Sequence, residues 1–161
     1  MPPHSSRPPL GVATFNVNGI RAARRRGFDT WLAGRELDVV ALQELRCPPE
    51  QVGVFDGYHA AMDCGSLPGR NGVAILTRDA PSDVRTWVSH PPRTRGLGVF
   101  ANEGRYLEVD LAGAPLTVAC LYLPKGACPR ICSGPATCAT CLTAASSTTG
   151  RCASSGRSRA S

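Results

Sequence analysis

The sequence lacks two features that direct a protein out of the cytoplasm: a membrane-spanning apolar run and a signal peptide. Residues 1–10 contain four prolines and no apolar segment of the kind that a signal peptide needs, so we expect this leader to be disordered. The absence of both features predicts a cytoplasmic protein with no membrane partner. In that compartment the eight cysteines are expected to stay reduced.

Acidic residues and histidine are absent from residues 127–161, which hold four arginines. Residues 1–126 hold fourteen basic and twelve acidic residues, a net of +2, so the C-terminal segment contributes the other four of the +6 charges. The total charge is therefore weak evidence for a nucleic-acid surface. The segment has only two large apolar residues, Ile131 and Leu142, too few to offset the entropy of ordering, and we expect it to lack stable structure.

Five of the eight cysteines lie in this C-terminal segment. Cys138 and Cys141 form a C-x₂-C pair, which suggests a zinc knuckle. Zinc ribbons place two tight pairs at regular spacing, and here one pair is tight and no histidine accompanies it. Zinc binding and cysteines without a ligand both stay open, and the second interpretation is favoured.

Residues 11–126 show the patterns of regular secondary structure. Val12–Val17 is typical of a buried strand, and Ala22–Leu37 of a helix with Phe28, Trp31 and Leu32 on its inner face. The apolar run 39–42 is typical of a strand buried in a parallel sheet. Strand, helix and strand within about thirty residues predict a βαβ unit.

The second half of this region predicts antiparallel strands. Five stretches alternate or are rich in apolar and β-branched residues, and an expected surface loop over 89–104 separates the last two from the first three. The expected strands cover residues 58–62, 72–77, 84–88, 105–111 and 116–122, the last two as a hairpin. Together with the βαβ unit, they predict an α/β domain with a mixed sheet.

Polar side chains follow both strands of the βαβ unit. Strand one ends at Asn16 and Asn18, and strand two ends at Glu44. Because parallel strands end at the same edge of a sheet, Asn16 and Glu44 should converge. A carboxylate and an amide oxygen suit Mg²⁺. From the pattern alone, a solvated glutamate and an Asn-Gly turn remain alternatives.

Five motifs in this region resemble those of the exonuclease III and apurinic/apyrimidinic endonuclease family, part of the endonuclease/exonuclease/phosphatase superfamily. They occur in the family's order along the chain. The matching segments are Thr14–Ala22, Asp38–Glu44, Gly72–Leu76, Arg105–Val109 and Leu121–Gly126. The resemblance implies a mixed-sheet sandwich with helices outside, of which residues 11–126 form the N-terminal half and, we expect, one sheet.

The resemblance also implies roles for individual residues. Glu44 would bind Mg²⁺, with Mn²⁺ as an alternative, and Asn16 would support the metal or the scissile phosphate. Tyr122 would hydrogen-bond the phosphate or the attacking water; from the pattern alone, a core tyrosine at a strand end is favoured. Asn18 stands where some relatives carry an acidic residue. Arg21, in a basic cluster with residues 24–26, would contact DNA phosphates, although a solvated helix start explains the cluster equally well.

The implied function is a Mg²⁺-dependent DNA phosphodiesterase of base-excision repair, acting as a monomer on double-stranded DNA with abasic or 3′-blocked sites. The family's Gly-Asp-x-Asn and Asp-His motifs do not occur in residues 127–161. Their absence predicts that this segment is out of frame and that the enzyme is truncated, with weak or no activity. Two alternatives remain: a phosphodiesterase or phosphatase from another branch of the superfamily, and a non-catalytic, frameshifted fragment.

Overall fold

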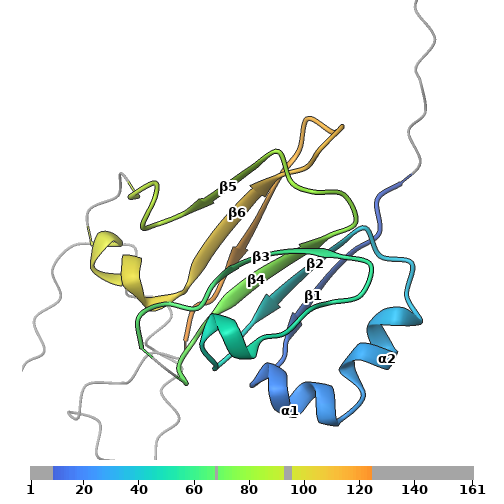
Figure 1. Ribbon diagram of the computed structural model, residues 1–161. Helices are drawn as coiled ribbons and strands as arrows, with labels where there is room; N and C mark the ends of the chain where they lie inside the picture. The colour runs from blue at the N-terminus through green and yellow to red at the C-terminus, as the bar shows by residue number, and fades with distance from the viewer. Residues whose placement is uncertain (1–8, 68, 93–95, 125–161) are drawn as a thin grey trace, which may run out of the picture. The chain divides into compact units, whose positions relative to one another are not determined.

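The computed structural model describes residues 9–67, 69–92 and 96–124. They form strands and short helices, as Figure 1 shows. In chain order they are β1 (Val12–Asn16), α1 (Ile20–Arg25), α2 (Phe28–Ala33), β2 (Val39–Gln43), the 3₁₀ helix η1 (Pro49–Gln51), β3 (His59–Asp63), β4 (Val73–Thr77), β5 (Asp83–Thr86), the 3₁₀ helix η2 (Gly98–Glu103), β6 (Tyr106–Asp110) and β7 (Thr117–Leu121). No helix among them is long and apolar enough to span a membrane.

The strands form two sheets, one of four strands in the order β1-β2-β4-β3 and one of three in the order β5-β6-β7. β1 and β2 are parallel, as the βαβ pattern predicts, and every other pairing is antiparallel. The expected sandwich is confirmed. The expectation that the chain supplies one sheet is wrong, because β5 pairs with β6 and not with β3 or β4.

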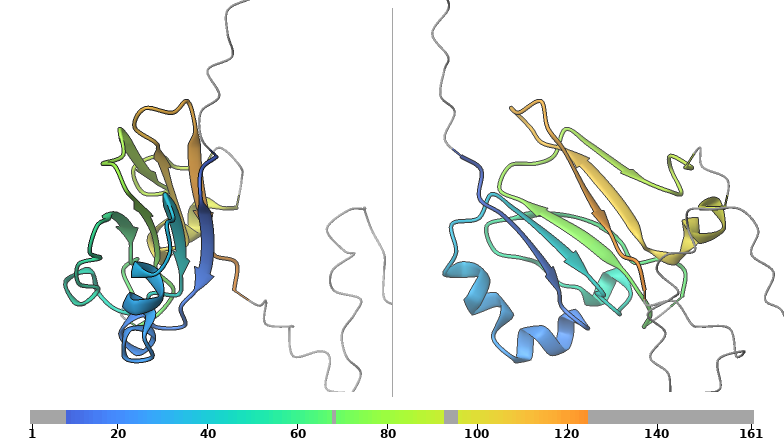
Figure 2. Two further views of the ribbon diagram at one scale, coloured as in Figure 1. Left: turned by 90° about the vertical axis from the view of Figure 1, so that its right-hand side faces the viewer. Right: turned by 180° about the vertical axis from the view of Figure 1, so that it is seen from behind.

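Two apolar cores explain this arrangement. Alternate residues of β2 and β4 point to opposite faces: Val40 and Leu42 pack against the helices, whereas Val39 and Ala41 face the three-stranded sheet. Leu107, fully buried on β6, belongs to the second core. Figures 1 and 2 show the resulting order of three-stranded sheet, four-stranded sheet and helices. The first four residues of β2 and of β4 are thus all apolar because both faces of these strands are covered.

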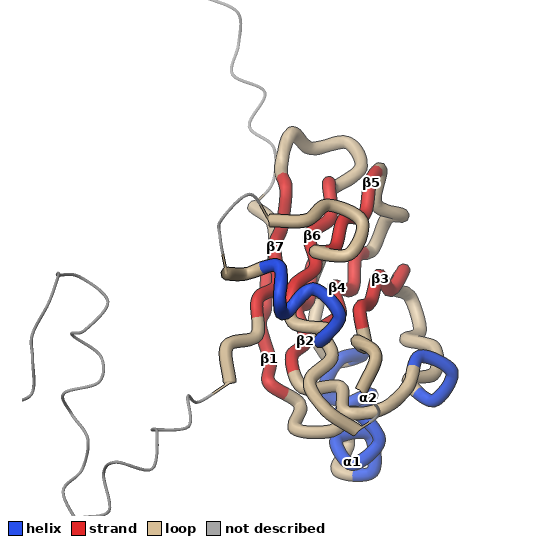
Figure 3. The backbone as a smooth tube through the Cα atoms, turned by 90° about the vertical axis from the view of Figure 1, so that its left-hand side faces the viewer, coloured by secondary structure: helices blue, strands red, loops and turns tan. Residues whose placement is uncertain are grey.

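The helical segment differs from its prediction. Instead of one helix over 22–37, the chain forms α1 and α2, which Figure 3 shows on the side of the four-stranded sheet away from β5–β7. Gly27 separates them with a φ of 94°, a conformation that ends a helix and is accessible to glycine at little cost. The predicted inner face is nevertheless correct, since Phe28 and Leu32 are buried and Trp31 packs against Phe15.

The remaining elements follow the predicted order with small shifts. β5 ends at Thr86, two residues before the expected strand end, and the predicted surface loop contains η2. Among the four edge strands, β1 and β7 expose apolar side chains. The prediction of a buried strand over Val12–Val17 is therefore wrong for β1, which lies at a sheet edge with most of its residues exposed. Phe15 and Leu121 each keep more than 40% of their surface accessible. The outer face of the three-stranded sheet is polar, with the Arg85 guanidinium paired to three carboxylates.

Candidate active site

Asn16 and Glu44 meet at the edge where β1 and β2 end. The Asn16 amide nitrogen donates to Glu44 Oε1 at 3.0 Å, and Asn16 Oδ1 accepts from the backbone N–H of Asn18 at 3.1 Å. The parallel pairing continues past the strands, since the N–H of Gly19 donates to the Glu44 carbonyl at 2.7 Å. The convergence predicted from parallel strand ends is therefore what the structure shows.

The loop after β2 turns the Glu44 side chain back toward β1. Glu44 and Arg46 both adopt left-handed backbone conformations, with φ of 58° and 51°. Left-handed backbone at residues other than glycine is uncommon and clusters at functional sites. The N–H groups of Leu45 and Arg46 donate to the carbonyls of Gly72 and Asn71, at 3.1 and 2.9 Å. The loop is thus fixed by the segment before β4.

Three polar groups hold the Glu44 carboxylate in its ionised form. The hydrogen bond from Asn16 lowers the pKa of Glu44 most, and those from Tyr122 and Arg46 add to it against the opposing effect of burial. The Arg46 guanidinium lies 2.5 Å from Glu44 Oε2. Glu44 is therefore an anion at neutral pH although only 12% of its side chain is exposed.

Tyr122 reaches the same carboxylate from the other sheet. It follows β7 directly, and its backbone N–H donates to the Arg105 carbonyl at 2.8 Å, which fixes the chain beyond the strand. Burial raises the pKa of Tyr122, and the hydrogen bond to Glu44 raises it further. The phenol thus stays protonated and can donate. Tyr122 is partly buried against the core between the two sheets, as the alternative of a strand-end core tyrosine expects, so the role in the site stays a prediction.

The basic cluster after β1 divides into two groups. Arg21 and Arg25 are exposed and line one pocket together with Arg46, beside the candidate site. Arg24 instead packs over the Phe55 ring and donates to the Val54 carbonyl at 2.7 Å. The interpretation of a single DNA-binding cluster is therefore wrong for Arg24, whose guanidinium is bound within the protein.

Arg46 is the site residue that sequence analysis missed. It is 45% exposed and forms the closest charged contact of Glu44. Its position two residues after the glutamate gives no periodic signal, and the contact arises only because both residues take left-handed conformations. No pattern in the sequence indicates this ion pair.

The donor set at this edge fits Mg²⁺ in part. Mg²⁺ is commonly held by one or two carboxylates, with water and phosphate oxygens completing its shell. Glu44 supplies one ionised carboxylate, and Asn16 supplies an amide that orients it. Among the residues that the structure describes, no group of three or more His, Cys, Asp or Glu side chains is placed to hold a metal ion. The fit therefore rests on a single carboxylate with water and substrate oxygens.

The fold is an α/β sandwich of one mixed and one antiparallel sheet, with a carboxylate at the shared end of the parallel strand pair. The model of the Endonuclease/Exonuclease/phosphatase family matches residues 13–147. The chain belongs to this family, and within it resembles the exonuclease III and AP endonuclease type.

Three relatives illustrate the similarity. A DNA-(apurinic or apyrimidinic site) endonuclease of Dictyostelium discoideum is 22% identical over 104 residues, 63% of this chain and 27% of the relative. An AP endonuclease from Archaeoglobus fulgidus is 30% identical with a TM-score of 0.57, over 72% of this chain and 42% of that structure. The 3′ phosphatase NExo from Neisseria, solved with a product DNA hairpin, is 23% identical with a TM-score of 0.54, over 71% and 41%. The chain spans less than half the length of each.

Proposed function

We propose that this chain carries the metal-binding part of the active site of a DNA phosphodiesterase that acts at abasic or 3′-blocked sites. The observation that carries the proposal is the ionised Glu44 carboxylate, held by Asn16, Tyr122 and Arg46 at the shared end of β1 and β2. The similarity to AP endonucleases supports DNA as the substrate. Residues 11–126 would be the N-terminal half of that domain, in a monomeric cytoplasmic protein.

The side chains divide the chemistry among them. Glu44 would hold Mg²⁺, or Mn²⁺, and Asn16 keeps its carboxylate aimed at the sheet edge. The ion, when bound, would neutralise charge on the phosphate and make its phosphorus more electrophilic. Tyr122 stays protonated, so its hydroxyl can donate to a phosphate oxygen as negative charge develops there.

The exposed arginines beside this edge suit the DNA backbone. Arg21, Arg25 and Arg46 line one pocket, and guanidinium groups bind phosphate oxygens through paired hydrogen bonds. Asn18 presents its backbone N–H to Asn16, which makes it a support of the site more than a ligand. Arg21 and Arg25 are therefore the residues proposed to contact phosphates on either side of the scissile bond.

The rate of this chain by itself is expected to be low. Hydrolysis needs a general base for the attacking water, and no cluster of further carboxylates or histidines accompanies Glu44 within the described residues. Loss of one such group commonly costs about a hundredfold or more in rate. We therefore expect slow nicking that depends on Mg²⁺.

A single-turnover nicking assay on a duplex with one abasic site tests the proposal. With the protein in excess, slow cleavage is expected that EDTA and Glu44→Gln each abolish. Glu36→Gln, a change of the same kind at an exposed glutamate, is the matched control and should cleave like the wild type. Equal cleavage by both variants would refute the role of Glu44, and no cleavage by the wild type would refute activity of this chain.

A further inference from the structure

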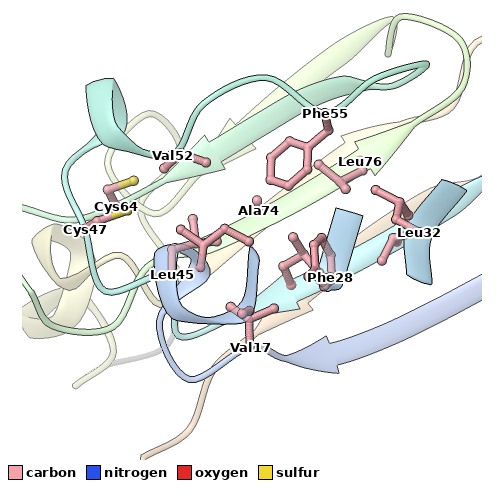
Figure 4. Packing of buried hydrophobic residues seen from close by; sticks show 14 residues of the cluster. Val17, Phe28, Leu32, Leu45, Cys47, Val52, Phe55, Cys64, Ala74 and Leu76 are labelled. Carbon is pink, nitrogen blue, oxygen red and sulfur yellow. The ribbon is translucent and has the colours of Figure 1, made fainter. Parts of the chain in front are cut away.

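Two buried free thiols, Cys47 and Cys64, lie together in the core between the helices and the four-stranded sheet. Cys47 follows the loop that carries Glu44, and Cys64 directly follows β3. Figure 4 shows their sulfur atoms beside each other. Burial raises the pKa of Cys64 most, and the charge of Cys47 is the next cause. The reaction proposed above uses neither thiol.

The surroundings hold Cys64 in place. The N–H of Gly65 donates to Asp63 Oδ1 at 3.0 Å, and the N–H of Ser66 donates to the Asn102 carbonyl at 2.8 Å. The backbone just before Cys47 is fixed as well, because the N–H of Arg46 donates to the Asn71 carbonyl. Both thiols thus come from restrained backbone, so their proximity does not depend on a flexible loop.

One of the two thiols is accessible from outside. Cys64 lines a surface pocket together with Asp63, Ser66 and Asn102. Cys47 is 4% exposed and does not line this pocket. A small oxidant that enters this pocket meets Cys64 first and finds a second thiol next to it. A lone buried thiol would not offer this arrangement.

We propose that Cys47 and Cys64 form a reversible intramolecular disulfide when the protein meets a peroxide. The peroxide oxidises the Cys64 thiol to a sulfenic acid, with its own O–O bond broken and one water released. The Cys47 sulfur then attacks the Cys64 sulfur, an S–S bond forms, and the hydroxyl leaves as a second water. Two electrons pass from the thiols to the peroxide, and a dithiol reductant reverses the link.

The link would form slowly and would act on the candidate site. Burial raises the pKa of both thiols, that of Cys64 to about 11, so little thiolate exists at neutral pH and sustained oxidation is needed. Once formed, the bond ties the loop of Glu44, three residues before Cys47, to the end of β3. Because a cross-link restricts the unfolded chain, the oxidised protein should unfold at a higher urea concentration than the reduced protein.

Peptide mapping of the full chain tests this site. The protein is treated with hydrogen peroxide, remaining thiols are alkylated, and the chain is digested with trypsin and a protease that cuts after Glu50. Trypsin leaves Cys47 and Cys64 in one peptide, residues 47–70, and the second cut separates them. We expect the two pieces to stay joined, with a mass about 2 Da below that of the two thiol peptides, and to separate after dithiothreitol.

Variants at the cysteines complete the test. Cys47→Ser and Cys64→Ser should each abolish the linked peptide, whereas Cys120→Ser, at a buried thiol in the other core, should keep it. Recovery of Cys47 and Cys64 as separate alkylated or overoxidised peptides would overturn the proposal, as would their pairing with other cysteines, provided that circular dichroism shows native fold. The wild-type map decides the question even where a serine variant fails to fold.

Discussion

Replacing Gly104 with alanine tests how the loop after β3 is held against the start of β6. Gly104 has a φ of 64°, and a Cβ atom on it would lie 2.5 Å from the backbone nitrogen of Gly65. The contact is reciprocal, since a Cβ on Gly65 would lie 2.5 Å from the carbonyl carbon of Glu103. The two backbones touch where no side chain fits.

The expected cost has two parts. The left-handed conformation costs alanine about 1 kcal/mol relative to glycine, and the overlap can be relieved only by moving backbone, at about 1–3 kcal/mol more. Gly104→Ala should therefore lower the free energy of unfolding by about 2–4 kcal/mol. The next residue, Arg105, accepts the hydrogen bond from the Tyr122 N–H, so the shift should also move Tyr122 away from Glu44.

Urea denaturation followed by tryptophan fluorescence measures this cost. Gly69→Ala is the matched control: its φ is 74°, but a Cβ there would have nothing within 4 Å. The control should lose only the conformational part, about 1 kcal/mol. Equal losses in the two variants would show that the contact between the Gly65 and Gly104 backbones is not tight, and the reasoning would fail.

Three other changes probe the core, the carboxylate and the basic pocket. Leu107→Ala should lower the free energy of unfolding by about 2–5 kcal/mol in the same urea assay, because Leu107 is fully buried between the sheets. A loss below about 1 kcal/mol would contradict this buried position. The lowered pKa of Glu44 contributes stability that is present above its unfolded pKa and is lost as the pH falls through the folded value. Asn16→Leu should raise the pKa of Glu44 in a carbon-detected NMR titration, so that the loss of stability is smaller and is complete at a higher pH. An unchanged pKa would refute the role of Asn16. Arg21→Ala should weaken duplex binding and reduce the slope of log affinity against log salt by about 0.9, whereas Arg24→Ala should leave the slope unchanged.

Much of the candidate site could be predicted because it depends on local patterns and one geometric rule. The apolar runs 12–17 and 39–42 indicate strands, although only β2 is buried and β1 is an exposed edge strand, and parallel strands end at the same edge of a sheet. That rule brings Asn16 and Glu44 together, and the structure joins them at 3.0 Å. The contact between Glu44 and Arg46 could not be predicted, since it depends on two left-handed residues without a sequence signal.

The division of the strands into two sheets could not be predicted from the sequence, for a different reason. Strand propensity shows that a segment is extended, whereas the choice of partner depends on contacts between residues far apart in the chain. Val39 and Val40 are both apolar, so the pattern does not show which side packs on the helices and which on a second sheet. The break between α1 and α2 could not be predicted for a similar reason. The apolar spacing of Phe28, Trp31 and Leu32 gives no sign that Gly27, just before them, adopts a left-handed conformation.

Glu44 is the carboxylate proposed to bind a divalent metal ion. NMR spectra of the labelled protein during titration with Mn²⁺ test it most directly, because the ion broadens the signals of nearby nuclei. Broadening is predicted to begin at Asn16, Glu44 and Tyr122 and to disappear from these residues in Glu44→Gln. Broadening that begins instead at the carboxylates around Arg85, or that is the same in Glu44→Gln, would contradict the account.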